Sequence, residues 1–219
     1  MKYDTYRGAL NTDLLWGAQF EGCYEIPTIR RTSLVPNDLI PFDKAISSRQ
    51  FNQWVHFYIH DYQFLRIWRN PWRYLPILLK FEGAISPDFS VMWDYPLYKQ
   101  LEAVCHSREL GSWMQRNGIP VIPNVRWGKE ATYGFAFDGI ELGGTVAVGT
   151  VGCMRDKESR EVFERGFGVM LERVVPSRIV VYGSCNSEVF QAAEHTGVEI
   201  VAFECVTTAA HRVKASCCG

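Results

Sequence analysis

Residues 81–127 read FEGAISPDFSVMWDYPLYKQLEAVCHSRELGSWMQRNGIPVIPNVRW, and this stretch decides the predicted fold. It begins with a short apolar run, 83–86, that ends just before Asp88. A helical segment follows and stops at Asn117, and a second apolar run occupies 119–125. Two apolar strands joined by a helical crossover are typical of a parallel βαβ unit.

Polar side chains stand where these two strands end. Asp88 follows the first strand, and Asn124 and Arg126 close the second. In parallel α/β proteins ligands bind outside the carboxyl ends of the strands, so we expect these three side chains at a shared mouth. The sequence therefore predicts where a ligand site would lie, but it does not identify a reaction.

The rest of the chain repeats this alternation of strands and helices. Further strands are expected at 39–46, 54–60, 146–149, 178–182 and 198–203, with helices at 62–68, 72–81, 157–174 and 187–195. Polar residues end several of the strands, so we predict a small or incomplete (β/α) barrel with mainly parallel strands. An open doubly wound parallel sheet is the alternative, because sequence patterning does not separate the two.

Length and composition favour a single α/β domain, 1–219, in the cytoplasm. Within it we expect an irregular N-terminal cap over 1–38 and a frayed tail over 211–219. No apolar run reaches the roughly 18 residues of a membrane span, and the N-terminus lacks the apolar core of a signal peptide, so no membrane partner is expected. Seven cysteines without CxxC spacing are expected to be reduced.

The charge balance argues against general attraction to nucleic acid. The chain has 23 basic and 24 acidic residues and a net charge of -1. A local basic patch is compatible with this balance, because net charge reports only the sum over the surface.

Six segments resemble one known family. They read HFYIHDYQF, GAISPDFSVMWD, IPVIPNVRWG, FAFDGI, VAVGTVGC and IVVYG. They are similar to segments of the bacterial and phage family described as domain of unknown function 4417, and the similarity extends from about residue 50 to residue 205. The resemblance implies a cytosolic protein of a bacterium, a phage or a mobile element, and it implies no activity and no catalytic residue.

Two carboxylates are candidates for acid and base chemistry. Asp88 and Glu204 both follow strands, and two carboxylates that converge at a mouth transfer protons in glycosyl and other hydrolytic reactions. The alternative is that such residues cap the helices that follow, which we favour for Asp61 and Asp94. Arg108 lies on the apolar stripe of its helix, where it is expected to reach a strand-end carboxylate or to lay its stem along the apolar face.

Two glycine turns are candidates for phosphate binding. Gly149 and Thr150 end one strand, and Gly183, Ser184 and Asn186 join another strand to a helix. Glycine lets a ligand approach the backbone amides, and a helix N-terminus favours anions. Neither turn is a Walker or dinucleotide fingerprint, and tight turns between strand and helix are the simpler explanation of the glycines.

Aromatic residues near the strand ends are candidates for stacking. Trp127 and Tyr182 would stack on a base or a sugar, with Arg126 binding a phosphate or a carboxylate, and packing in the core is the equal alternative. His56 and His60 lie four residues apart on an expected strand. Histidines on the polar face of a strand are more often surface or hydrogen-bonded groups than ligands, so no metal site is predicted.

These features support two functional hypotheses. The first is a hydrolase or transferase of phage or mobile-element type that acts on a nucleotide or sugar phosphate, with Asp88 and Glu204 moving protons. The second is a non-catalytic protein that binds or sequesters a nucleotide or a host protein. An enzyme needs a carboxylate or histidine with a shifted pKa in its pocket, whereas a sequestering protein needs only donors and stacking faces. The sequence predicts neither a cofactor nor an oligomeric state.

Overall fold

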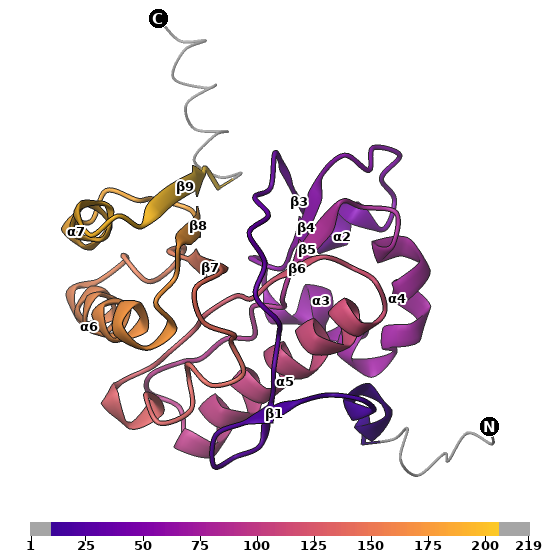
Figure 1. Ribbon diagram of the computed structural model, residues 1–219, viewed down its shortest axis with the longest axis horizontal. Helices are drawn as coiled ribbons and strands as arrows, with labels where there is room; N and C mark the ends of the chain where they lie inside the picture. The colour runs from indigo at the N-terminus through magenta and orange to yellow at the C-terminus, as the bar shows by residue number, and fades with distance from the viewer. Residues whose placement is uncertain (1–9, 206–219) are drawn as a thin grey trace, which may run out of the picture.

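The computed structural model describes residues 10–205, which form an α/β protein (Figure 1). Four parallel strands form a first sheet in the order β3 (Leu39–Pro41), β4 (Trp54–His56), β5 (Gly83–Ile85) and β6 (Val121–Ile122). Three parallel strands form a second sheet in the order β7 (Thr145–Gly149), β8 (Arg178–Tyr182) and β9 (Glu199–Phe203). In both sheets the strand order follows the chain order.

A single parallel bridge continues the first sheet into the second. Asn124, just beyond β6, pairs with Ala147 of β7. The amide of Val125 donates to the carbonyl of Ala147, and the amide of Ala147 donates to the carbonyl of Pro123, each at 2.8 Å. The predicted parallel α/β class is therefore confirmed.

The described strands do not close into a barrel. Within residues 10–205 no hydrogen-bonded pair joins β3 to β9, so both remain edge strands. The strand order does not reverse either, and a doubly wound sheet requires such a reversal. Neither of the two predicted architectures is confirmed in its closed or doubly wound form.

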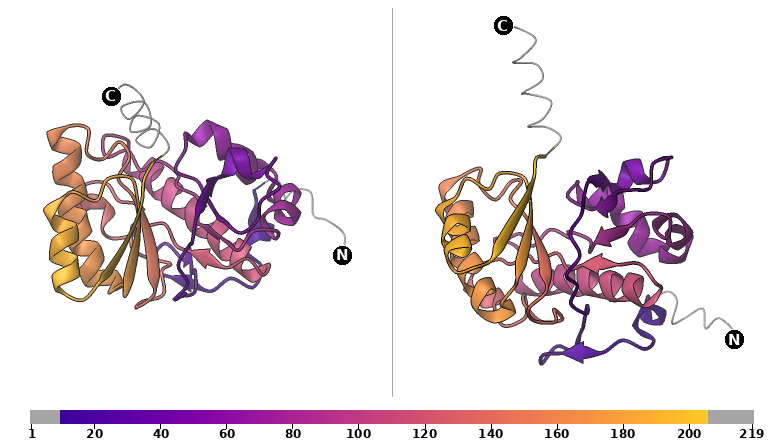
Figure 2. Two further views of the ribbon diagram at one scale, coloured as in Figure 1. Left: turned by 90° about the horizontal axis from the view of Figure 1, so that it is seen from above. Right: turned by 45° about the horizontal axis from the view of Figure 1, so that its top comes forward.

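Helices connect the strands in the way that parallel pairing requires. The helices α3 (Asp61–Arg69) and α4 (Pro71–Leu78) lie between β4 and β5, and α5 (Leu97–Arg116) lies between β5 and β6. The helices α6 (Lys157–Val174) and α7 (Glu188–His195) follow β7 and β8. Figure 2 shows α6 and α7 on the side of the second sheet that faces away from the first sheet.

Strands β7 and β8 of the second sheet are buried on both faces, whereas β9 is partly exposed. Val148 and Val181 pack in one cluster with Phe167 of α6 and Phe190 of α7. Alternate residues of the same strands point to the opposite face, because side chains in a strand have a period of two. There Ala147, Val180 and Tyr182 join a second cluster with Trp54, Ile85 and Ile122 of the first sheet.

Side chains bring strands into contact that are far apart in the strand order. The ring of Tyr58, which follows β4, stacks on Tyr182 of β8 with 4.9 Å between ring centroids and 10° between planes. The ring of His56 lies 4.4 Å from the same tyrosine. Because β5, β6 and β7 stand between β4 and β8 in the order, the sheets must curl toward each other.

Prolines explain why two strands of the first sheet are shorter than predicted. The strand expected at 39–46 ends at Pro41, and α2 (Phe42–Ala45) follows it. The strand expected at 119–125 is reduced to β6 between Pro120 and Pro123. Proline has no amide hydrogen and cannot donate to a ladder. Residues 129–140 contain the 3-10 turn η2 (Glu130–Thr132) and otherwise mainly form turns.

The N-terminal segment is more regular than expected. It contains the 3-10 turn η1 (Thr12–Leu15) and an antiparallel pair, β1 (Phe20–Glu21) with β2 (Ile26–Pro27). Residues 1–9 of the expected cap and the expected frayed tail, 211–219, lie outside the described residues. Within the described range no helix is both long and apolar enough to cross a bilayer.

Candidate functional site

The polar side chains beyond β5 and β6 form one hydrogen-bonded network. Asp88 accepts from Nε of Arg126 at 2.7 Å and from Nη2 of Arg126 at 2.8 Å. The side-chain amide of Asn124 donates to Asp88 at 2.8 Å, and the hydroxyl of Tyr58 donates to Asn124 at 3.0 Å. The structure therefore brings together three residues that the sequence placed at one mouth.

Strand pairing positions this network. In the parallel pair of β5 and β6, Ile85 lies opposite Ile122, so both chains leave the sheet at the same edge. The hydroxyl of Ser86 accepts from the amide of Asn124 at 2.8 Å and fixes the exit of the second strand. Asp88, beyond β5, and Arg126, beyond β6, therefore lie close enough to form an ion pair.

The network is buried and charged. Asp88 is 6% exposed, Asn124 is 1% exposed, and the side chain of Arg126 is 23% exposed. Burial opposes the charge of Arg126, but the carboxylate of Asp88 raises the pKa of Arg126 well above its usual value. Burial, and then Asp88, raise the pKa of Tyr58, so the phenol stays neutral. Removing either member of a buried ion pair leaves an uncompensated charge.

Arg126 also reaches the second sheet. Its Nη1 donates to the carbonyl of Gly149 at 3.3 Å and to the sulfur of Cys153 at 2.9 Å. A Cβ at Gly149 would lie 2.7 Å from the ring of Tyr58, so only glycine allows this approach. The amide of Thr150 donates to the carbonyl of Tyr182 at 3.0 Å. The predicted residues of β7 and β8 thus border the network.

These contacts use most of the hydrogen-bonding capacity of the two charged residues. Asp88 accepts three hydrogen bonds and Arg126 donates four. A carboxylate with four acceptor sites and a guanidinium with five donors have little left for a ligand.

Glu204 does not share this environment. It follows β9, and the strand order places β6, β7 and β8 between β9 and the strand that leads to Asp88. Glu204 is exposed whereas Asp88 is buried. The two predicted catalytic carboxylates thus follow different strands and differ in exposure.

The turn after β8 touches the turn after β7. Gly183 has a φ of 113°, and a Cβ there would lie 2.5 Å from the hydroxyl of Thr150. Ser184 and Asn186 are exposed on the same turn. The structure therefore places the two glycine turns side by side, as a shared phosphate site would require.

Trp127 lies in the core. Its indole packs at 5.3 Å from the ring of Phe163 on α6, and its Nε1 donates to the carbonyl of Val162 at 3.3 Å. It is 7% exposed. Packing is thus the observed environment of this tryptophan.

Two parts of the network were missed by the sequence reasoning. Tyr58, after β4, donates to Asn124, and Cys153, after β7, accepts from Arg126. The alternation of His56 and Tyr58 on one side of the predicted strand was a usable signal for Tyr58. No comparable pattern marks Cys153.

Arg108 satisfies backbone carbonyls. It is 1% exposed and donates to the carbonyls of Asn124, Ala136 and Asp138 at 2.8, 3.1 and 3.1 Å. Burial lowers the pKa of Arg108 to about 10. The sequence predicted that Arg108 would bind a carboxylate or lay its aliphatic part along the apolar face. In the structure it instead donates to backbone carbonyls of the chain that follows β6.

His56 is a hydrogen-bond acceptor. Its Nδ1 accepts from the amide of Tyr58 at 3.2 Å, and burial lowers the pKa of His56 to about 3. His60 instead precedes α3, where Gln63 accepts from its amide. Among residues 10–205 no three His, Cys, Asp or Glu side chains converge in a way that could hold a metal ion.

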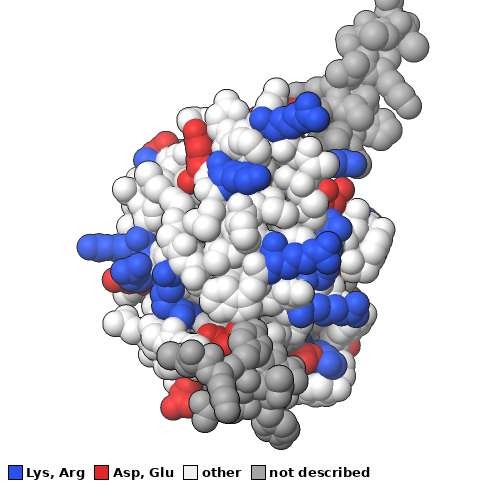
Figure 3. All heavy atoms as spheres, turned by 90° about the vertical axis from the view of Figure 1, so that its right-hand side faces the viewer, with Lys and Arg blue, Asp and Glu red and all other residues white. Residues whose placement is uncertain are grey.

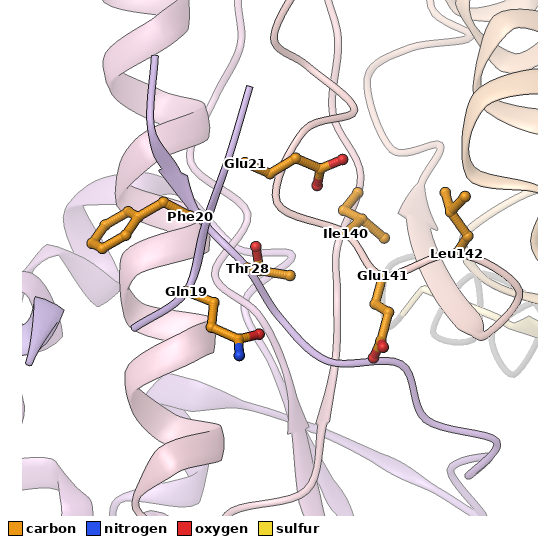
Figure 4. Close-up of a pocket in the computed structure, with 7 residues that line it drawn as sticks. All are labelled: Gln19, Phe20, Glu21, Thr28, Ile140, Glu141 and Leu142. Carbon is orange, nitrogen blue, oxygen red and sulfur yellow. The ribbon is translucent and has the colours of Figure 1, made fainter. Parts of the chain in front are cut away.

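One surface hollow, of about 600 Å³, contains no predicted site residue (Figure 4). It lies between the β1 and β2 hairpin and the chain that leads into β7. Its two carboxylates are engaged, since Glu21 accepts from the amide of Gly139 at 2.9 Å and Glu141 accepts from the amide of Arg31 at 2.7 Å. The lining residues are Gln19, Phe20, Glu21, Thr28, Ile140, Glu141 and Leu142.

The second hollow, about 500 Å³, lies on the strand-end side of the second sheet. It is lined by the chain between β7 and α6 and by the first turns of α6, namely Arg155, Asp156, Lys157, Arg160, Glu161 and Glu164. Ser187, at the start of α7, donates to Glu164 at 2.8 Å. The hollow therefore adjoins the turn that carries Ser184 and Asn186.

The fold and the network define an α/β protein of parallel strands with a buried ion pair at the strand ends. The chain belongs to the family described as domain of unknown function (DUF4417), whose model matches residues 18–204. The resemblance seen in the sequence is thus confirmed.

The relatives are phage proteins. The Gene 1 protein of Mycobacterium phage L5 is 35% identical over 164 residues, which cover 73% of this chain and 71% of that protein. The Gene 1 protein of Mycobacterium phage D29 is 34% identical over 167 residues, which cover 73% of this chain and 60% of that protein. No solved structure matches the chain. The expected phage-type relationship is therefore confirmed.

Proposed function

We propose that this protein binds a small phosphate-bearing ligand, a nucleotide or a sugar phosphate, in the cytoplasm without transforming it. The absence of catalysis is inferred from one observation: the carboxylate of Asp88 already accepts hydrogen bonds from Arg126 and Asn124. A general base must reach the proton that it abstracts, and this carboxylate is buried against a guanidinium. Glu204, its proposed partner in catalysis, follows a different strand.

Groups with shifted pKa values also favour binding over catalysis. The pKa of His56 is lowered to about 3, so this imidazole cannot take up a proton near neutral pH. Burial raises the pKa of Glu109 to about 7, but Glu109 lies on α5 and lines neither hollow. A titrating group placed in a pocket is what an enzyme requires.

The ligand-binding part rests on the corner between β7 and β8. The turns at Gly149 and Gly183 lie in contact there, with the amides of Thr150 and Gly183 bonded to the carbonyls of Tyr182 and Phe203. Arg155, Lys157 and Arg160 line the adjoining hollow together with three carboxylates, and among the described residues Arg155 and Arg160 are in no ion pair. A phosphate is recognised by such unpaired cations. Ser184 and Asn186, both exposed, would add hydroxyl and amide contacts.

We further propose that the seven strands are an incomplete (β/α) barrel with its mouth at this corner. Two observations support this architecture. The strands follow one another in chain order, and the rings of Tyr58 and His56, near β4, contact Tyr182 of β8. Ligands of (β/α) barrels bind at the carboxyl ends of the strands, often near the last ones.

Titration calorimetry with nucleotides and sugar phosphates tests the ligand. Arg160→Gln should weaken binding about tenfold, because a charge-assisted hydrogen bond contributes roughly 1.5–3 kcal/mol. Arg165→Gln is the matched control, since Arg165 lies on the same helix and does not line the hollow. Equal losses in both variants, or no binding to the wild type, would refute the site.

Phosphorus NMR of the same mixtures tests the absence of catalysis. The ligand should be recovered unchanged after prolonged incubation with the protein. Release of inorganic phosphate, or transfer of the phosphoryl group, at a rate that Asp88→Asn abolishes would establish the enzymatic alternative instead.

A further inference from the structure

The face formed by α2, α3 and α4 carries a positive charge that the whole chain does not. Residues 44–80 contain six Lys and Arg and one acidic residue, Asp61, whereas the whole chain has a net charge of -1. Asp61 accepts two hydrogen bonds from Ser90, so its carboxylate is engaged within the fold. The six cations are all exposed: Lys44, Arg49, Arg66, Arg69, Arg73 and Lys80. Figure 3 shows this side of the molecule, where Lys and Arg predominate over Asp and Glu.

Helical spacing aligns part of this charge. On α3, Tyr62, Arg66 and Arg69 follow the spacing i, i+4, i+7 and therefore share one face. The opposite face of α3 buries Phe64 and Ile67 in the core. Helix α4 packs against α3, and its first turn exposes Trp72 and Arg73. The exposed surface of the helix pair is thus a stripe of cations and aromatic rings.

Among the described residues, most of these cations are in no ion pair. Within the described residues, Lys44 is paired with Asp43 at 3.8 Å, and no ion pair involves the other five. Arg66 lies over the ring of Phe42 at 5.4 Å, and Lys80 lies over the ring of Phe51 at 5.6 Å. A ring holds the cation in place without neutralising it. The charges remain available to an anionic partner.

Two exposed aromatic rings are held in place beside the arginines. Tyr62 is 77% exposed and stacks on His60 with 5.8 Å between ring centroids and 12° between planes. Trp72 is 41% exposed, and its Nε1 donates to the buried Asp13 at 2.7 Å. Rings fixed in this way at the surface are platforms on which a base can stack.

We propose that this face binds single-stranded nucleic acid, with Arg69 and Arg73 at phosphates and Tyr62 beneath a base. Four of the six cations are arginines, whose planar guanidinium matches a phosphate with two hydrogen bonds. Stacking requires unpaired bases, which favours a single strand over a duplex. An anionic membrane is less suited, because α3 exposes no continuous apolar face to insert. The surface is separate from the corner between β7 and β8.

Fluorescence anisotropy with a labelled oligothymidylate of roughly 20 nucleotides tests the proposal. Wild-type binding should weaken steeply as salt rises. Arg69→Gln combined with Arg73→Gln should lower affinity about 25-fold at about 0.1 M salt and reduce the logarithmic salt slope by ~1.4, because each phosphate contact contributes ~0.7. Tyr62→Ser should lower affinity at least about fivefold and leave the salt slope unchanged, since a stacked base contributes no counterion release.

Matched variants elsewhere on the surface are the controls. Arg30→Gln combined with Arg165→Gln removes two exposed arginines outside the face, and Tyr98→Ser removes an exposed tyrosine on α5. Both should bind as the wild type does, and circular dichroism should show all variants folded. The proposal is overturned if the wild type does not bind the oligonucleotide, if the control pair loses as much affinity as the test pair, or if the protein binds phosphatidylserine vesicles and not the oligonucleotide.

Discussion

Arg126 is the residue on which the strand-end network depends, because it contacts both sheets. It pairs with Asp88 beyond β5 and donates to the carbonyl of Gly149 in β7. Its side chain is 23% exposed, so water weakens the ion pair only in part. The pair therefore has more effect on stability than a surface salt bridge would.

Asp88→Ala should lower the free energy of unfolding by about 3–5 kcal/mol, because it leaves the Arg126 guanidinium buried without a counter-charge. The double variant Asp88→Ala with Arg126→Met should lose less than the sum of the two single variants, since it removes both charges together. Urea unfolding at constant m-value measures all four proteins. Additive losses would mean that the pair has no mutual stabilisation and that the network is not a unit.

His56 makes stability depend on pH with a defined sign. Its pKa is about 3 in the folded protein and near 6.5 when the chain unfolds, so between these values the unfolded state binds the extra proton. The contribution is fully present above pH 6.5 and is lost as pH falls toward 3, by at most about 1.4 kcal/mol per pH unit. His56→Asn should remove this component from a urea-unfolding profile against pH. His60→Gln, at an exposed position, should leave the pH dependence of the free energy of unfolding unchanged. If His56→Asn also leaves it unchanged, His56 is not the source of this pH dependence.

Sequence patterns predicted which residues lie near one another when strand pairing alone determines their positions. They did not predict which side chains form hydrogen bonds with one another. Asp88 was expected near Arg126 because a βαβ unit brings its strand ends to one edge. That Arg126 would occupy Asp88 with two hydrogen bonds depends on their relative orientation, which no pattern encodes. The same holds for Gly183, where the structure puts Thr150, not a ligand, next to an added Cβ. Gly183→Val is therefore expected to destabilise the fold.

Helix α6 shows how well an element can be predicted when its ends are marked. Its observed bounds, Lys157–Val174, equal the predicted ones. Asp156 accepts from the amide of Ser159 at the first turn, and Pro176 follows the last turn. The strands of the second sheet were predicted to within one residue, and β8 equals the predicted 178–182. The strands of the first sheet were predicted less well, because a strand of two or three residues has too few positions to show a period.

Two glycines of α6 predict opposite outcomes for the same substitution. A Cβ at Gly166 would lie 2.2 Å from the indole of Trp127, whereas a Cβ at Gly168 would meet nothing within 4 Å. Glycine to alanine in a helix normally stabilises by about 0.5–1 kcal/mol. Gly168→Ala should therefore raise the melting temperature, and Gly166→Ala should lower it because Trp127 must shift. Scanning calorimetry measures the melting temperature of both variants. A higher melting temperature for Gly166→Ala would contradict the prediction and show that Trp127 can move freely.

Across the whole molecule, the exposed basic face and the buried ion pair of Asp88 and Arg126 lie in different places. The cations of residues 44–80 lie on the outer surface of the first sheet's helices, while the buried ion pair lies between the two sheets. The net charge of -1 conceals this separation, since it averages a basic face against an acidic remainder. Sequence composition alone therefore argued against a nucleic-acid partner, and the arrangement of the helices was needed to show where such a partner would bind.

The contacts between the sheets predict that the chain unfolds as one unit, which is the expectation for a single domain. The bridge at Asn124 and Ala147, the reach of Arg126 to Gly149, and the stacking of Tyr58 on Tyr182 all join the halves. Native-state hydrogen exchange measures the opening free energy of each strand. Amides of β5 and β8 should exchange with the same free energy in the wild type, because neither sheet can open while these contacts persist. In Arg126→Met the amides of β8 should exchange more readily than those of β5, since the second sheet then loses one of the contacts that join it to the first. A difference above about 1 kcal/mol already present in the wild type would mean that the two sheets are independent folding units.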